Sequence, residues 1–176
     1  ANDDRSLADL VRRCEQMQAA RGFRVRLQMD ATQAIAVISE IKRKSPSKGL
    51  LRADLDPQFL ADAYQAGGAS CLSVLTDEDF FAGSIEDLQI AAAACTLPVL
   101  RKDFTVSPHD VCDTRLMGAD CVLLIAATLD PHELKDLHHL ATSIGLDVLV
   151  EIHDEAELEV ALFAEALLIG VNQRDL

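Results

Sequence analysis

The chain has 176 residues, of which 49% are hydrophobic, 26% charged and 4% aromatic. These fractions indicate one globular domain, or a large part of one, and exclude a disordered chain. The chain has 16 basic and 29 acidic residues, so its formal net charge is −13, which excludes general nucleic-acid binding. The longest apolar run, Cys121 to Ala127, is too short to cross a bilayer, and no secretory leader pattern is visible. We therefore expect a cytoplasmic protein with no membrane partner.

Two smaller features of the composition narrow the possible chemistry. A local cluster of basic residues stands out against the acidic background, and an anionic ligand would need such a cluster; it comprises Lys42, Arg43, Lys44, Lys48 and Arg52. The five cysteines are odd in number and have no CxxC spacing, so neither a disulfide framework nor a zinc site is supported. We expect reduced core residues instead.

The first 34 residues predict a helical extension followed by a connector. Ser6 can cap a helix with Asp9 three residues later, and apolar residues follow at helical spacing from Leu7 onward. Gly22 is suited to end this helix. We interpret Arg24 to Thr32 as the connector and residues 35–176 as the main folded unit.

From residue 35 onward, short apolar runs alternate with amphipathic stretches. The runs predict strands near Ala36 (AVISEI), Cys71 (CLSVL), Pro98 (PVL), Cys121 (CVLLI), Asp147 (DVLV) and Leu167 (LLIGV). The amphipathic stretches predict helices over Pro57–Ala66, Ile85–Ala94, Pro108–Met117, Pro131–Ile144 and Ala156–Ala164. Cap-plus-proline starts, as at Asp56-Pro57, and glycine stops, as at Gly118, support these boundaries. Repeated strand–helix alternation predicts a parallel sheet with right-handed crossovers.

Two α/β architectures fit this alternation: a doubly wound open sheet and a (β/α)8 barrel. No GxGxxG or GxxxxGK[ST] motif follows the first strand, which excludes the usual nucleotide-binding versions of the open sheet. Six strands are counted, whereas a closed barrel needs eight and typically about 250 residues. The barrel reading therefore implies that the chain covers about six of its β/α strands.

Charged and amide side chains follow four of the predicted strands, where a parallel barrel places its chemistry. Glu40 and Lys42 follow the first strand two residues apart, so they share one face of an extended chain. Lys102 follows the third strand, Glu151 ends the fifth, and Asn172 follows the sixth. Each alone could be a rim ion pair or a helix cap. Their coincidence at one end of the sheet favours a functional site.

Other polar residues are given structural interpretations. We expect the acidic residues from Asp77 to Asp79 to form a solvated loop, and His138 and His139 to lie on a solvated helix face. We also expect His153 to have a capping or loop role. Ser47 and Ser84 lack the GxSxG context of a serine nucleophile.

Six strings at these strand ends resemble the motifs of one enzyme family. They are SEIKRKSPSKG (39–49), SVLTDEDFFAGS (73–84), PVLRKDF (98–104), GADCVLLI (118–125), LVEIH (149–153) and IGVNQRDL (169–176). In order and spacing they are similar to indole-3-glycerol phosphate synthase of tryptophan biosynthesis, a (β/α)8 TIM-barrel lyase. That family closes and decarboxylates 1-(2-carboxyphenylamino)-1-deoxyribulose 5-phosphate, giving indole-3-glycerol phosphate, carbon dioxide and water.

The resemblance implies catalytic roles for five residues. Lys102 is expected to be the general acid that activates the substrate carbonyl, and Glu151 a general base in the later loss of water. Glu40 and Lys42 are expected to bind the region of the substrate carboxylate and to share in the dehydration. Asn172 is expected to orient the substrate and the catalytic side chains.

The resemblance also implies a set of substrate-binding residues. Arg174 is expected to orient the substrate together with Asn172. The phosphate-proximal loop and the anthranilate pocket are expected to be lined by Ser45, Phe81, Phe104 and Leu123. The expected ligand is a small phosphorylated, anthranilate-derived molecule, with no metal or organic cofactor and no nucleic-acid partner.

The resemblance further implies two strands, the seventh and eighth, whose glycine- and serine-rich loops hold most of the substrate phosphate. These strands follow the point that Leu176 occupies in the family pattern. A non-catalytic barrel fragment that associates through open sheet edges is therefore an alternative, and a monomer, a homodimer and self-association are all considered. Phosphoribosylanthranilate isomerase ranks last, because SPSKG and RKDF do not belong to its expected Cys/Asp pattern.

Overall fold

The computed structural model describes residues 4–52 and 54–173. The main sheet consists of β1 (Ile38–Ile41), β4 (Cys71–Leu75), β5 (Val99–Lys102), β6 (Cys121–Ile125), β7 (Asp147–Ile152) and β8 (Ile169–Val171). A small hairpin is made of β2 (Lys44–Ser45) and β3 (Gly49–Leu50). The helices are α1 (Leu7–Glu15), α2 (Phe23–Ala31), α3 (Pro57–Ala66), α4 (Glu78–Phe81), α5 (Ile85–Ala94), α6 (Pro108–Leu116), α7 (Pro131–Ser143) and α8 (Glu155–Phe163), with a 3₁₀ turn, η1 (Ala126–Thr128).

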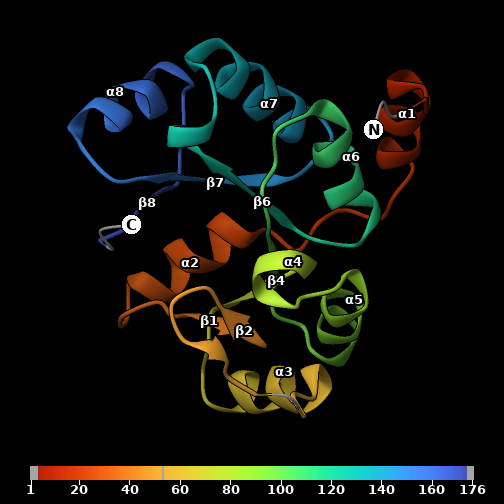
Figure 1. Ribbon diagram of the computed structural model, residues 1–176, viewed down its shortest axis with the longest axis vertical. Helices are drawn as coiled ribbons and strands as arrows, with labels where there is room; N and C mark the ends of the chain where they lie inside the picture. Colours follow the sequence, from red (N-terminus) through yellow and green to blue (C-terminus); the bar gives the residue numbers. More distant parts are fainter. Residues whose placement is uncertain (1–3, 53, 174–176) are drawn as a thin grey trace.

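The strand order decides between the two predicted architectures. The six main strands pair in parallel, and each one lies beside the next in the order β1-β4-β5-β6-β7-β8. A doubly wound sheet reverses its strand order and carries helices on both faces. Here the order never reverses, and α3, α5, α6, α7 and α8 surround the outside of a curled sheet (Figure 1). The arrangement is that of a partial (β/α)8 barrel.

Two apolar clusters join the outer face of the sheet to the helices. One packs β6 and β7 against α6, α7 and α8, and the other packs β1, β4 and β5 against α3 and α5. Fully buried members include Val74, Leu88, Val122 and Leu134. Burying one such side chain contributes about 1.5–3 kcal/mol, so these contacts hold the strands at fixed positions around the curve.

The inner face of the sheet is covered by α2, where the sequence predicted only a connector. Phe23 is completely buried in a cluster with Cys71, Leu100, Cys121 and Leu123. Figure 1 shows α2 inside the curve of the sheet, on the side opposite to the outer helices. The connector prediction was wrong because the residues that hold α2 come from distant strands and leave no local periodicity.

The N-terminal extension is tied to the amino ends of the strands by two carboxylates. Asp120 accepts hydrogen bonds from the backbone and the side chain of Arg21, both at 2.8 Å, and Asp147 accepts one from the backbone of Arg24 at 2.9 Å. Ser6 precedes α1 as predicted, but its side chain makes no capping hydrogen bond. Helix α1 instead packs beside α6 (Figure 1). The division at residue 34 remains a prediction.

Most other element boundaries agree with the sequence analysis, because their signals are local. Asp56, Ser107 and Asp130 accept backbone hydrogen bonds as caps before the prolines that start α3, α6 and α7. Gly118 and Gly145 have φ angles of +94° and +84°, in the left-handed region that ends a helix. Among residues 4–52 and 54–173, no helix combines the length and the apolar character needed to cross a membrane.

Candidate active site

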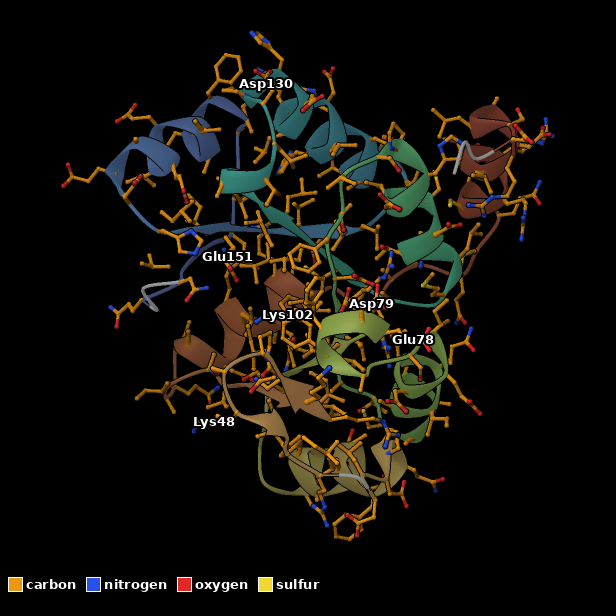
Figure 2. All side chains as sticks on the ribbon, viewed as in Figure 1. Lys48, Glu78, Asp79, Lys102, Asp130 and Glu151 are labelled. Atoms are coloured by element: carbon orange, nitrogen blue, oxygen red, sulfur yellow. The ribbon has the colours of Figure 1, made fainter. Side chains whose placement is uncertain are left out.

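The alternation of side chains along the strands brings four predicted site residues into one cavity. Glu40, Lys42, Lys102 and Glu151 lie at the carboxyl ends of β1, β5 and β7 and line a cavity of about 570 Å³. Figure 2 shows Lys102 and Glu151 near the middle of the molecule, whereas Lys48 and Asp130 lie toward its periphery.

Glu40 is the centre of a three-residue ion cluster. Its Oε1 accepts a hydrogen bond from Nζ of Lys42, and its Oε2 lies 3.2 Å from Nζ of Lys102. Burial opposes ionisation of Glu40, but the hydrogen bonds and charges of the two lysines outweigh it and lower the pKa of the carboxyl below its usual value. Glu40 is therefore ionised at neutral pH, and it holds two ammonium groups at the cavity wall.

Glu151 forms a second group with Asn172 on the far strands of the sheet. The amide Nδ2 of Asn172 donates to Oε1 of Glu151 at 3.0 Å, and both residues line the cavity. The backbone N–H of Asn172 donates to the carbonyl of Ile152 at 2.8 Å, which continues the pairing of β8 with β7. The amide thus orients a carboxylate that faces the two lysines across the cavity.

Aromatic side chains form another wall of the cavity. Phe81, Phe104 and Leu123 line it as the resemblance implied, and Phe80 lines it as well. The rings of Phe80 and Phe104 meet edge to face with centroids 6.2 Å apart. This combination of apolar rings and opposite charges suits a ligand with an aromatic part and an anionic part.

The acidic residues from Asp77 to Asp79, predicted to form a solvated loop, instead begin the short helix α4 that carries Phe80 and Phe81. Asp77 caps the short helix α4 by accepting from the backbone N–H of Phe80 at 2.7 Å. The chain then returns close to β4 at Gly83, where a Cβ would lie 2.2 Å from the carbonyl oxygen of Leu75. The capping pattern of an aspartate before an acidic turn could have indicated this helix.

One predicted binding residue does not line the cavity, and another cannot be compared with it. Ser45 does not line it: its hydroxyl accepts a hydrogen bond from the backbone N–H of Lys48 at 3.2 Å and stabilises the turn between β2 and β3. Its neighbour Pro46 lines the cavity instead. Arg174 lies outside the described residues.

A second, smaller cavity of about 330 Å³ lies at the opposite, amino ends of the strands. Its lining includes Gly22, Arg24, His138 and Asp147. His138 is buried, contrary to the predicted solvated face, and its Nδ1 has no hydrogen-bond partner. Within the described part of the chain, no group of three or more His, Cys, Asp or Glu side chains is arranged to hold a metal ion.

Comparison with known proteins bears on both the fold and the family. A solved structure from Coccidioides immitis, named as a fructose-1,6-biphosphate aldolase, superposes with a TM-score of 0.61 at 12% identity. The match covers 90% of this chain and 62% of the other, and it concerns the fold alone. It agrees with the partial barrel described above.

The sequence matches are more specific. A protein of Bordetella pertussis (strain Tohama I) named indole-3-glycerol phosphate synthase is 52% identical over 177 residues. The match covers all of this chain and 68% of that relative. The family model described as indole-3-glycerol phosphate synthase matches residues 1–176. The resemblance drawn from six strand-end motifs is thus confirmed, and the chain belongs to the indole-3-glycerol phosphate synthase family.

Proposed function

We propose that this chain supplies the acid and base groups for the ring closure of 1-(2-carboxyphenylamino)-1-deoxyribulose 5-phosphate to indole-3-glycerol phosphate. The observation that carries the proposal is one cavity that combines two lysines and two glutamates with aromatic side chains. The non-catalytic fragment is not favoured by the comparisons, which name the same synthase.

The first chemical step needs a proton at the substrate carbonyl. As the aromatic carbon bonds to the carbonyl carbon, negative charge develops on the oxygen, and a nearby ammonium group can donate a proton to it. Lys102 is suited to this role because its Nζ is held 3.2 Å from Oε2 of Glu40 at the cavity wall. Loss of carbon dioxide then restores the aromatic ring.

The later loss of water needs a proton acceptor and a proton donor. Glu151 is suited to accept the proton, because the amide of Asn172 fixes one of its oxygens and leaves the other for the substrate. Lys42 is suited to bind the substrate carboxylate before it leaves, Glu40 holds the ammonium group of Lys42 in place, and the pair would share in the dehydration. Phe81, with the aromatic wall around it, would hold the anthranilate ring and exclude water.

The remaining predictions follow from the proposed reaction. The ligand is a small phosphorylated molecule, and Arg174 stays a predicted orienting residue. A cytoplasmic location agrees with the five cysteines, all of which are free and buried. Monomer and homodimer both remain open to measurement.

The test is turnover of the anilino-ribulose phosphate by the 176-residue chain. The chain contains no tryptophan, so formation of the indole product can be followed by its fluorescence. We expect Lys102→Ala to lower kcat by about 10²–10⁴-fold, the usual range for loss of a general acid. Lys135→Ala is the matched control, because Lys135 pairs with the exposed Glu165 on the outer surface and its loss should change kcat by less than about twofold.

Two results would contradict the proposal. Absence of product from the unmodified chain would show that these residues do not suffice for the reaction. Equal kcat values for Lys102→Ala and Lys135→Ala would remove Lys102 from the acid role.

A further inference from the structure

Lys102 is flanked in sequence by two charged residues that pair with each other. Nη2 of Arg101 donates to Oδ2 of Asp103 at 2.8 Å, and the two side chains are only 11% and 13% exposed. Because side chains alternate along a strand, Lys102 points to the cavity between them. The ion pair therefore brackets the proposed general acid: Asp103 lines the cavity beside Lys102, whereas Arg101 does not.

One residue of the neighbouring strand contacts this whole segment. Thr76, which directly follows β4 and is buried, donates its backbone N–H to the carbonyl of Lys102 at 3.2 Å. Its hydroxyl donates to Oδ2 of Asp103 at 2.5 Å and accepts from Nε of Arg101 at 3.0 Å. The hydroxyl of Thr76 thus uses both its donor and its acceptor capacity on the two neighbours of Lys102.

The same ion pair extends to the cavity wall on one side and to α6 on the other. Oδ1 of Asp103 accepts from the backbone N–H of Phe104 at 2.8 Å, so the carboxylate directs the chain as it leaves β5. Nη1 of Arg101 donates to Oγ1 of Thr114 at 3.0 Å and to the carbonyl of Asp110 at 3.4 Å. The end of β5 is therefore fixed by β4 and α6 together.

We propose that Thr76 and Asp103 are positioning residues that hold Lys102 and Phe104 in the geometry needed for the reaction. Asp103 lies between Lys102 and Phe104 in the chain, and all three line the cavity. The hydroxyl of Thr76 holds the carboxylate of Asp103. Displacing a catalytic group by about 1 Å can cost about 10²-fold in rate, so a contact outside the cavity has a large effect through Lys102. The kinetic part rests on the proposed function; the placement of Lys102 does not.

Three matched variants separate positioning from plain stability. Thr76→Val keeps the shape of the side chain but removes the hydroxyl, whereas Thr76→Ser keeps the hydroxyl. Thr114→Val is the control, because Thr114 is also buried and its hydroxyl accepts a hydrogen bond from Arg101 but donates to the carbonyl of Asp110 instead of to Asp103. A merely structural role would make the two valine variants alike.

The kinetic readout is the separate measurement of kcat and KM. We expect Thr76→Val to lower kcat by about 10–100-fold, with a smaller change in KM, because the acid is displaced in the transition state. Thr76→Ser and Thr114→Val should keep kcat within about threefold of the unmodified chain. The proposal is overturned where Thr76→Val keeps kcat within that range or Thr114→Val loses as much.

A second readout needs no turnover. Lysine side chains labelled by reductive ¹³C-dimethylation keep their charge, and the signal of Lys102 can be identified by its loss in Lys102→Arg. We expect the chemical shift of this signal to move toward that of the exposed Lys48 in Thr76→Val and to stay unchanged in Thr114→Val. A shift in Thr76→Val without turnover by the unmodified chain would reject the proposed function and keep the positioning role. An unmoved signal would reject the positioning role even in an active enzyme.

Discussion

Helix α2 offers the sharpest test of the fold, because one of its side chains fills the inner face of the curled sheet. Phe23 is completely buried there. Phe23→Ala should lower the free energy of unfolding by about 3–5 kcal/mol, the usual cost of truncating a buried phenylalanine. In a chain of this length, each kcal/mol shifts Tm by about 2–4 °C, so we expect Tm to fall by about 6–20 °C.

The assay is urea unfolding followed by circular dichroism, with two comparison variants. Met29 lies on the same helix and is 62% exposed, so Met29→Ala should change stability by less than about 0.5 kcal/mol. Phe23→Leu keeps much of the volume and should cost less than about 1.5 kcal/mol. If Phe23→Ala cost no more than Met29→Ala, α2 would not be seated in the sheet, and the reasoning would be refuted.

Two further predictions concern buried polar groups. Burial, with a smaller contribution from the neighbouring histidine, lowers the pKa of His138 below 6.5, so the unfolded chain takes up the proton first and stability should fall as pH drops below about 6.5. His138→Gln should reduce this loss of stability when the urea midpoints at pH 7.5 and pH 5.5 are compared. An unchanged difference between the two midpoints would contradict the prediction. Arg43 makes two 2.7 Å hydrogen bonds to Asp87, which is 7% exposed, so Asp87→Asn should cost about 2 kcal/mol in thermal unfolding. Asp54→Asn, in an exposed pair, should cost less than about 0.5 kcal/mol, and equal costs would contradict the anchoring role of Asp87.

Much of the fold could be predicted because its signals are local. The helices Pro57–Ala66 and Ile85–Ala94 begin and end where capping residues and apolar spacing placed them. Helix α2 could not be predicted in this way, because Phe23 is held by strands that lie far along the chain. A helix stabilised mainly by tertiary contacts leaves a weak pattern in its own residues.

The part of the candidate site that lies at the carboxyl ends of the strands could be predicted from the sequence. Glu40, Lys102 and Glu151 were placed together because parallel strands deliver their carboxyl ends to one edge. The hydrogen bond that the hydroxyl of Ser45 accepts from the backbone of Lys48 in the hairpin could not be predicted in this way. Such pairings depend on register and loop geometry, which the order of residues does not reveal.

Along two strands, the alternation of side chains places a lysine of the proposed site toward the cavity and the neighbouring arginine toward the outer helices. On β5, Lys102 faces the cavity and its neighbour Arg101 faces outward to Thr114 of α6. After β1, Lys42 faces the cavity and its neighbour Arg43 faces outward to a carboxylate of α5. In both places the planar guanidinium makes several hydrogen bonds at once, whereas the lysine presents a single mobile charge. Exchanging lysine and arginine at either place would therefore move the guanidinium to the cavity and the ammonium group to the helices, although the net charge would not change.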